Sequence, residues 1–217
     1  MWVLKNQDFF KTSPYTNVKL AIVDPPYGIG YKDVEAGYYD EGVNLDLLAQ
    51  LLKMWLDKDA WLLVFTSFMN YCQVYYAMEK YFRFRQKLVW FRPNMSKGTN
   101  IAKLPFYNVH EDILVFSKGS PKRPNKNDVG HNIDVLKYAT PQTNYKIDKR
   151  IHPNQKPFKL IEHLVVAFSD EKDYILDPFA GSGVVGKVCK KHNRHYIGFE
   201  VNEIYYQRAL QNIGKEE

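Results

Sequence analysis

The stretch Lys19-Leu20-Ala21-Ile22-Val23-Asp24-Pro25-Pro26-Tyr27-Gly28 decides the fold. Its apolar run lacks alternation, which is typical of a strand buried on both faces in a parallel sheet. Two prolines follow, and because they lack N–H donors the sheet ladder must stop there in a stiff turn. Ligands of open α/β sheets bind at such carboxyl ends of strands. The sequence therefore predicts a cleft lined by Asp24, Pro25, Pro26 and Tyr27.

The chemistry of this motif suits an amino group carried on an aromatic ring. The carboxylate of Asp24 and the carbonyl of Pro25 can each accept a hydrogen bond from an NH2 group, while the ring of Tyr27 stacks on the plane that carries it. A turn that merely ends a strand is the alternative interpretation of an isolated motif of this kind. The rest of the chain has to decide between the two.

Composition predicts one globular domain. The chain has 217 residues, 45% of them hydrophobic and 25% charged, which is enough for a full core. No apolar run approaches the roughly 18 residues that span a bilayer, and residues 1–5 lack a signal-peptide pattern. The two cysteines show no metal-ligand spacing, and His192 and His195 are interpreted as surface residues flanking a strand. We therefore expect no metal, no membrane and a reduced, cytoplasmic compartment.

The positive charge of the chain is concentrated in one region. Residues 81–126 hold ten lysines and arginines against two acids, Glu111 and Asp112, whereas the net charge of the whole chain is +6. Such a local excess is typical of a surface that faces a polyanion, and a solvated basic face is the alternative. The residues predicted to face this polyanion are Arg92, Lys97, Lys103, Lys122 and Arg123.

The remaining pattern alternates strands and helices. Strands are expected at 2–5, 19–23, 60–66, 83–91, 113–116, 174–177 and 196–199, and helices at 44–58, 68–81, 157–168, 184–191 and 202–213. Residues 83–91 alternate basic and apolar side chains, which indicates an edge strand. Residues 28–42 are expected to form a mobile loop over the cleft, and 92–109 and 118–150 are irregular segments.

A second motif, Tyr174-Ile175-Leu176-Asp177-Pro178-Phe179-Ala180-Gly181-Ser182-Gly183, resembles the start of a nucleotide-binding half-domain. A strand, a glycine loop, a helix and a further strand lead to Glu200, which is placed to bond ribose hydroxyls. Residues 181–186 also match GxGxxG, so a nicotinamide-dependent oxidoreductase is an alternative. Asp177 argues against it, because a carboxylate beside the loop would repel a pyrophosphate and attract an ammonium group.

The order of these motifs predicts a circular permutation. Only one helix follows Glu200, so the half-domain lacks its third strand after that point. The strand expected at 2–5, which ends near Asp8, is the one strand without an assigned neighbour. We expect this strand to be the missing third strand of the half-domain, with the Asp24 strand following it in sequence.

In this order, the DPPY motif (24–27), the basic region, HPNQKP (152–157) and DPFAGSG (177–183) resemble the β-group of amino-methylating DNA methyltransferases. The resemblance covers nearly the whole chain. It implies a single Rossmann-like class I methyltransferase domain, with a mostly parallel α/β sheet, helices on both faces and a circularly permuted motif order. It also implies S-adenosylmethionine as cofactor and the exocyclic amino group of adenine, less often of cytosine, as target.

The resemblance further implies site residues. Asp24, Pro25, Pro26 and Tyr27 would form the catalytic loop, with Asp24 also near the cofactor. The other cofactor-binding residues would be Asp8 at the adenine edge, Lys156 and Pro157 over the methionine tail, Asp177, Phe179, Ala180, Gly181, Ser182 and Gly183 around the methionine part, and Glu200 at the ribose. Trp90, Arg92 and Asn94 resemble the W-x-K-x-N pattern of the family, with arginine in place of lysine.

Partners and target follow from the same resemblance. Double-stranded DNA is the expected substrate, with the target base flipped out, and residues 1–217 form one domain whose segments 92–109 and 118–150 face the DNA. A restriction endonuclease partner, a homodimer and a bacterial or phage-encoded cytoplasmic enzyme are compatible with it. Asp24 favours adenine over cytosine, and Gly28 and Gly30 leave room for a purine. A catalytically silent nucleic-acid-binding module is the alternative from another class.

Overall fold

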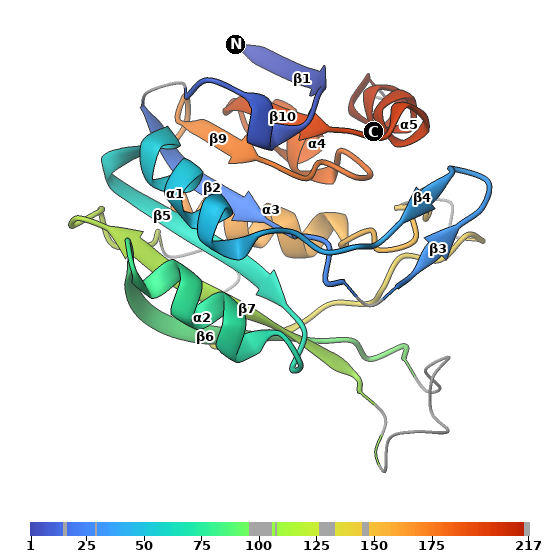
Figure 1. Cartoon of the computed structure of the whole chain (residues 1–217), viewed down its shortest axis with the longest axis horizontal. Helices are drawn as coiled ribbons and strands as arrows, with labels where there is room; N and C mark the ends of the chain where they lie inside the picture. The colour runs from blue at the N-terminus through green and yellow to red at the C-terminus, as the bar shows by residue number, and fades with distance from the viewer. Residues whose placement is uncertain are drawn as a thin grey trace.

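The computed structural model describes residues 1–14, 17–28, 30–95, 106, 108–125, 133–144 and 148–214 (Figure 1). Within them, eight strands form one sheet in the order β1-β10-β9-β2-β5-β7-β6-β8. The strands are β1 (Trp2–Asn6), β10 (His195–Glu200), β9 (Tyr174–Asp177), β2 (Val18–Val23), β5 (Leu56–Thr66), β7 (His110–Lys118), β6 (Arg83–Phe91) and β8 (Val135–Lys137). Neighbouring strands are parallel except for the two pairs that β7 makes. The predicted mostly parallel α/β sheet is therefore confirmed.

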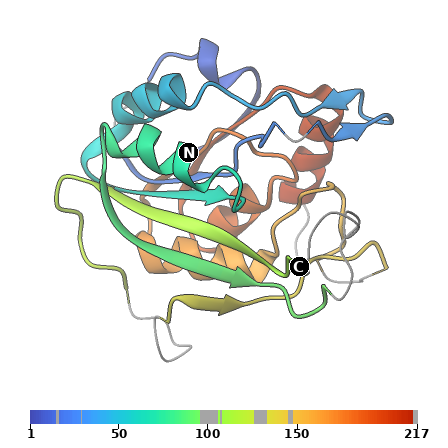
Figure 2. The ribbon, with the colours of Figure 1, turned by 60° about the horizontal axis from the view of Figure 1, so that its bottom comes forward.

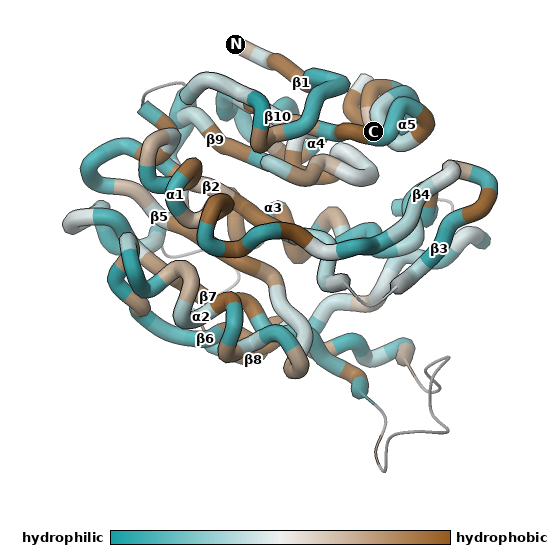
Figure 3. The backbone as a smooth tube through the Cα atoms, in the orientation of Figure 1, coloured by the Kyte–Doolittle hydropathy of each residue, from teal (hydrophilic) through white to brown (hydrophobic). Residues whose placement is uncertain are grey.

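Helices cover both faces of the sheet. The 3-10 helix η1 (Phe9–Lys11), α1 (Leu45–Trp55) and α2 (Tyr71–Glu79) lie on one face, and α3 (Phe158–Phe168), α4 (Val184–Lys191) and α5 (Glu203–Gly214) lie on the other. Within β2, Leu20 and Ile22 pack with the α3 and α4 side, whereas Ala21 and Val23 pack with the α1 side. This two-sided burial explains the unalternated apolar run of β2, and Figure 3 shows apolar segments along the central strands.

The pairing of β1 confirms the predicted permutation. β1 runs parallel to β10, with Trp2 opposite Tyr196 and Asn6 opposite Glu200. β10 in turn pairs with β9, and β9 with β2. The strand that opens the chain thus completes the cofactor half-domain that the last two strands begin.

The boundary between α1 and β5 and the edge of the sheet at β6 differ from the sequence prediction. Helix α1 ends at Trp55 and β5 begins at Leu56, whereas the apolar spacing had favoured a helix to Lys58. Leu56 fits the apolar spacing of the helix, which is why the helix was expected to continue. In the structure it belongs to β5, where it is buried and pairs with Val18. Strand β6 is not a full edge strand, because the unpredicted β8 pairs with Val89–Phe91.

The loop expected at 28–42 contains a hairpin. β3 (Lys32–Asp33) pairs with β4 (Tyr38–Tyr39), and Figures 1 and 2 show this hairpin projecting beside α5. It is tied there by a hydrogen bond from the hydroxyl of Tyr205 to Oδ2 of Asp33 at 2.6 Å. In the part of the chain that the structure describes, no helix has the length and apolarity to cross a bilayer.

Candidate active site

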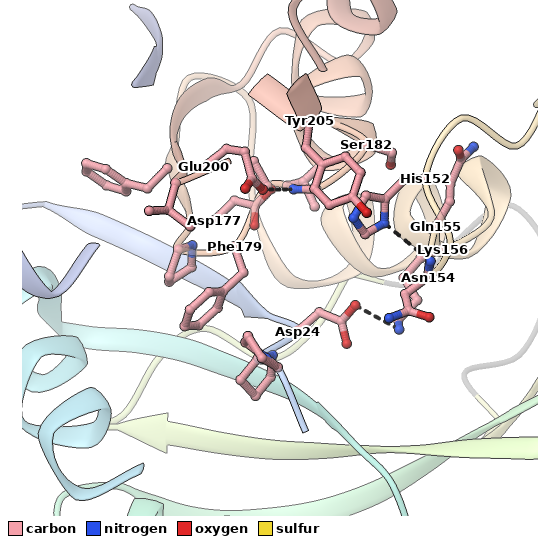
Figure 4. Close-up of a pocket in the computed structure, with 18 of the residues that line it drawn as sticks. Asp24, His152, Asn154, Gln155, Lys156, Asp177, Phe179, Ser182, Glu200 and Tyr205 are labelled. Atoms are coloured by element: carbon pink, nitrogen blue, oxygen red, sulfur yellow. Dashed lines mark hydrogen bonds and ion pairs between the residues drawn. The ribbon is translucent and has the colours of Figure 1, made fainter. Parts of the chain in front are cut away.

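A cavity opens at the carboxyl ends of β2, β9 and β10 (Figure 4). Asp24, Asp177 and Glu200 stand at or just after these strand ends, and the strands are adjacent and parallel, with Ala21 opposite Leu176. The chain leaves β2 toward β5 and leaves β9 toward β10, in opposite directions along the sheet, so the cavity lies at a topological switch point. Its empty volume is about 1120 Å³ with the open mouth included.

The catalytic loop predicted from the DPPY motif lines this cavity. Asp24 accepts a hydrogen bond at Oδ1 from the hydroxyl of Tyr27, at 3.0 Å. The backbone of the loop is fixed from outside, because the carbonyl of Tyr27 accepts from Asn70 at 2.7 Å and Asp40 accepts from the N–H of Gly28 at 2.8 Å. Pro25 and Pro26 line the cavity between these anchors.

Lys156 lines the same cavity, beside the catalytic loop, and its contact with the methionine tail stays a prediction. Its ammonium nitrogen lies 2.8 Å from Oδ2 of Asp24 and 3.1 Å from Oε2 of Glu111, and its side chain is only 7% exposed. Glu111 also receives a hydrogen bond from Arg92 at 3.0 Å. The lysine is thus held in the catalytic loop's own charge network.

Asp177 is almost fully buried where the cavity meets the end of β9. Its side chain accepts a hydrogen bond from the hydroxyl of Tyr196 at 3.1 Å. Burial raises the pKa of Asp177 to about 7. Tyr196 can reach Asp177 because residue 198 is glycine: a Cβ at Gly198 would lie 2.1 Å from the Tyr196 oxygen.

Glu200 organises the glycine loop. Its Oε2 accepts from the N–H of Gly181 and its Oε1 from the N–H of Asn202, both at 2.9 Å. Burial raises the pKa of Glu200. Gly181 has a φ of +51°, and a Cβ there would come within 3.3 Å of the His152 ring. The glycine therefore serves both the left-handed turn and the close approach of the HPNQKP segment.

The remaining cofactor residues divide into two groups. Asp8 lines the cavity beyond the end of β1 and caps η1 by accepting from the N–H of Phe10 at 2.9 Å. Phe179, Ala180 and Ser182 also line it. Pro157 and Gly183 are not among the lining residues: they stand at the N-terminal ends of α3 and α4.

Several lining residues were not predicted from sequence. They are the aromatic and polar side chains Tyr31, Tyr38, Asp40, His152, Asn154 and Tyr205. The ring of His152 packs edge-on against Tyr205 at 4.3 Å, and burial lowers the pKa of His152 to about 4, so it is neutral at physiological pH. The HPNQKP motif carried the signal for His152 and Asn154, whereas Tyr31, Tyr38, Asp40 and Tyr205 belong to none of the motifs.

The charge of the cavity favours a cationic ligand over a pyrophosphate. Five carboxylates line it, and Lys156, the one lysine among the lining residues, is already paired with Asp24. The N–H of Gly181 is used by Glu200 and that of Gly183 by Ala180, so these two donors are not directed at a phosphate. This site fits S-adenosylmethionine, which carries a sulfonium and an ammonium group, and opposes the oxidoreductase interpretation. Among the described residues, no cluster of three His, Cys, Asp or Glu could hold a metal ion.

The residues predicted to face DNA do not lie together. Arg92 is held beside the catalytic loop by Glu111. Lys122 and Arg123 lie at the opposite edge of the sheet, in a hollow shared with Lys19 and Asp173 at the amino ends of β2 and β9. The ammonium of Lys122 pairs there with Asp170 at 3.0 Å. Lys97 and Lys103 fall outside the described residues.

Comparisons with known proteins agree with this geometry. The model of the N6/N4 DNA methylase family matches residues 18–211. Type II methyltransferase M.HpaI of Haemophilus parainfluenzae is 28% identical over 92% of this chain and 69% of its own length. DNA adenine methyltransferase YhdJ of Escherichia coli is 26% identical over 94% and 78%. Type II methyltransferase M1.MboII of Moraxella bovis is 28% identical over 93% and 91%.

Solved structures share the fold. The M1.HpyAVI–SAM complex superposes with a TM-score of 0.77 at 23% identity, covering 99% of this chain and all of that one. The cytosine-N4-specific PvuII DNA methyltransferase gives a TM-score of 0.78 at 18% identity, covering 99% and 86%. With the family match, these findings show that the chain belongs to the N6/N4 DNA methylase family, whose members use S-adenosylmethionine, and that it is a DNA methyltransferase.

Proposed function

We propose that this member of the N6/N4 DNA methylase family transfers a methyl group from S-adenosylmethionine to the exocyclic amino group of adenine in a flipped-out nucleotide of double-stranded DNA. The observation that supports it most is the placement of Asp24, which opens into the same cavity as the buried carboxylates Asp177 and Glu200. An acceptor for an amino group and an acid-lined cofactor pocket thus face each other across one space.

Asp24 and Pro25 would act on the target amino group. The nitrogen of an aromatic amine is a poor nucleophile because its lone pair is delocalised into the ring. Hydrogen bonds from its two N–H groups to the carboxylate of Asp24 and the carbonyl of Pro25 favour the form with a localised lone pair. The same acceptors stabilise the positive charge that develops on the nitrogen in the transition state. The methylated amine then loses a proton to Asp24 or to water.

The cofactor would be held by the acidic end of the cavity. When bound, S-adenosylmethionine supplies an electrophilic methyl group on its sulfonium. Asp177 would pair with the ammonium group, Glu200 would accept from ribose hydroxyls and Asp8 would bond the adenine edge. Asp177 and Glu200 are held in place by Tyr196 and by backbone N–H groups, so their orientation is set before any ligand arrives.

Tyr27 would stack on the extruded base. Its hydroxyl donates to Asp24 and its carbonyl is fixed by Asn70, so the ring stands beside the acceptor carboxylate. A base within a duplex cannot reach a cavity of this depth, which is why the nucleotide has to be flipped.

Adenine is proposed over cytosine on two grounds. The first residue of the four-residue motif is Asp24, which the family resemblance associates with adenine enzymes, and YhdJ is named a DNA adenine methyltransferase. Gly28 adopts φ +67° and packs against Gly42, so the turn itself favours glycine there. The room that Gly28 and Gly30 leave for a purine stays a prediction. Cytosine stays the alternative.

The DNA would lie over a second groove beside the cavity. Tyr31 and residues 152–155 line both spaces, and the groove also presents Arg92, Arg150 and Arg208. Arg150 and Arg208 replace Lys122 and Arg123 in the proposed phosphate contacts, because they stand on the catalytic side of the sheet, whereas Arg92 is held by Glu111. Segments 92–109 and 118–150 stay the proposed source of sequence recognition, and the described parts of both contribute to the groove wall.

Biological context is proposed from the relatives. Several are named type II methyltransferases, which favours a restriction endonuclease partner and a bacterial or phage-encoded cytoplasmic enzyme. A homodimer is compatible with the recognition segments being short. Expression of the chain in a methylation-deficient host, followed by sequencing of its modified bases, would identify the recognition site.

One experiment tests the proposal directly. The purified chain is incubated with isotopically labelled S-adenosylmethionine and unmethylated DNA, and the digested nucleosides are separated by mass spectrometry. We expect labelled N6-methyladenine. Labelled N4-methylcytosine alone would overturn the choice of base, and absence of label from DNA despite cofactor binding would favour the silent nucleic-acid-binding module.

A further inference from the structure

We propose that Glu111 is a positioning residue for methyl transfer, which shares the ammonium group of Lys156 with Asp24 and so leaves Asp24 free to accept the target amino group. The inference rests on the proposed catalytic role of Asp24. It adds a residue of β7, far from either motif in sequence, to the machinery of the reaction.

The geometry is an alternating row of charges. The ammonium of Lys156 lies between Oδ2 of Asp24 at 2.8 Å and Oε2 of Glu111 at 3.1 Å. The guanidinium of Arg92 closes the row at 3.0 Å from Oε1 of Glu111 and also donates to the carbonyls of Asn108 and His110. Four separate segments of the chain therefore converge on one row.

The surroundings of this row strengthen the electrostatic attraction between its side chains. The Lys156 ammonium lies 4.9 Å from the centre of the Phe65 ring and 5.9 Å from that of Trp90. Aromatic walls exclude water, so each attraction is larger than it would be at the surface. Apolar residues of similar volume would stabilise a fold at least as well as buried ions of this kind. A function in the reaction explains why a charged row stands here.

Lys156 competes with the substrate for Asp24. A lysine paired with Asp24 alone would direct its full charge onto the carboxylate and weaken it as an acceptor of further hydrogen bonds. Glu111 draws the same ammonium from the other side, which divides its charge between two carboxylates. The distances of 2.8 and 3.1 Å show that the ammonium is held by both.

The ionisation of Asp24 reports this balance. Burial raises the pKa of Asp24, Lys156 lowers it and Glu111 raises it. The other titratable or charged side chains that face this network are Tyr27 of the same loop, Tyr38 of β4, Arg92 after β6, His152 before α3 and Asp177 of β9. Removing the charge of Glu111 should therefore lower the pKa of Asp24, and removing that of Lys156 should raise it.

The test compares Glu111→Gln, Lys156→Met and a matched control, Asp112→Asn. Asp112 is the next residue of β7, is also buried and pairs with Lys87 at 3.3 Å, outside the row. The pKa of Asp24 is measured in the cofactor-free protein from the carbon-13 shifts of labelled aspartate carboxyl groups, with Asp24→Asn identifying the signal. Thermal unfolding and binding of S-adenosylmethionine confirm that each variant is folded.

We expect the pKa of Asp24 to move down in Glu111→Gln and up in Lys156→Met, with no movement in Asp112→Asn. In methylation of unmethylated DNA with labelled S-adenosylmethionine, kcat of Glu111→Gln should fall by about tenfold at neutral pH while cofactor affinity changes by less than about threefold. The acidic limb of the pH–rate profile should shift to lower pH in Glu111→Gln and to higher pH in Lys156→Met.

Movement of the Asp24 pKa in the same direction in both charge variants, or an unchanged kcat in Glu111→Gln, would overturn the positioning role. If the wild-type protein does not methylate DNA at all, the proposed function is overturned instead. The carboxyl titration separates the two failures, since it requires neither cofactor nor DNA.

Discussion

The hydroxyl of Tyr196 lies 3.1 Å from Oδ2 of Asp177, and both side chains are buried beneath the glycine loop. Because β9 and β10 are adjacent and parallel, two residues that are far apart along the chain meet at the floor of the cofactor site. The bond orients a carboxylate that burial has made unusually easy to protonate.

The affinity for S-adenosylmethionine should fall as the pH drops below 7. The pKa of Asp177 is about 7 in the free protein, and a bound ammonium group favours the ionised carboxylate, so binding below that pH must release a proton. We expect about tenfold weaker binding at about pH 6 than at about pH 8. Calorimetry in buffers of different ionisation enthalpy measures both affinity and proton release. Asp177→Asn should bind weakly with no such dependence; an unchanged pH dependence would reject Asp177 as its source.

Gly198→Ala should impair the cofactor site without touching it directly. The added Cβ would lie 2.1 Å from the oxygen of Tyr196, so the ring has to leave Asp177. We expect a loss of about 1–3 kcal/mol in the free energy of unfolding from overpacking, together with weaker cofactor binding. Gly214→Ala is the control, since nothing lies within 4 Å of its added Cβ. Wild-type affinity in Gly198→Ala would mean that the Tyr196–Asp177 bond is dispensable.

Asp24→Ala should abolish methyl transfer and leave cofactor affinity within about tenfold of wild type, because Asp24 addresses mainly the target amino group. Single-turnover transfer and equilibrium binding separate the two effects. The variant also leaves Lys156 without one of its two carboxylates, so its folding has to be checked by thermal unfolding. Turnover that survives the substitution would remove Asp24 from the mechanism.

Glu200→Ala should weaken cofactor binding by roughly 1–3 kcal/mol, the scale of hydrogen bonds to a charged acceptor. The loss combines the ribose contact with disorder of the glycine loop, whose Gly181 N–H would lose its acceptor. Glu203→Ala is the matched control, because that carboxylate is exposed on α5 and bonds only Gln207 in the described contacts. Equal affinities in the two variants, measured by calorimetry, would reject the ribose role.

DNA affinity should depend on the arginines of the groove. If Arg150 and Arg208 each neutralise a phosphate, replacing both by glutamine should reduce the slope of log K against log salt by about 1.8. The paired control replaces Lys122 and Arg123, at the opposite edge of the sheet, and should leave the slope unchanged. The reverse pattern in salt-dependent binding titrations would return the phosphate contacts to Lys122 and Arg123.

The sequence was sufficient where a strand end carries the chemistry. Asp24, Asp177 and Glu200 each close a buried strand, and parallel strands present their carboxyl ends at one edge, so their convergence followed from order alone. Glu111 could not be found this way. It stands within β7, which was expected to begin at Ile113, and its partner Lys156 follows 45 residues later with no local pattern to link them.

Counting charges along the sequence could not show which basic residues lie on the same side of the sheet. Lys122 and Arg123 belong to the basic region between residues 81 and 126, but β7 runs antiparallel to its neighbours and carries the chain to the far edge before residue 122. From Thr66 opposite Asp112 to Ala60 opposite Lys118 the pair covers about 20 Å. A sum of charges along a sequence contains no information about such a reversal. The short strand β8 was missed because three residues in a polar region leave no periodic signal.

The pairing of β1 with β10 constrains the order in which the strands of the sheet can assemble. During synthesis the first strand leaves the ribosome early, yet its neighbour in the sheet is made some 190 residues later, so it must wait unpaired while the central strands assemble. Asp8 and Glu200, which both line the cavity, come to it together only at that late step. During refolding, S-adenosylmethionine binding should therefore appear only when β1 pairs with β10. A nascent chain that lacks β10 cannot be stabilised by the cofactor, because its binding site is incomplete.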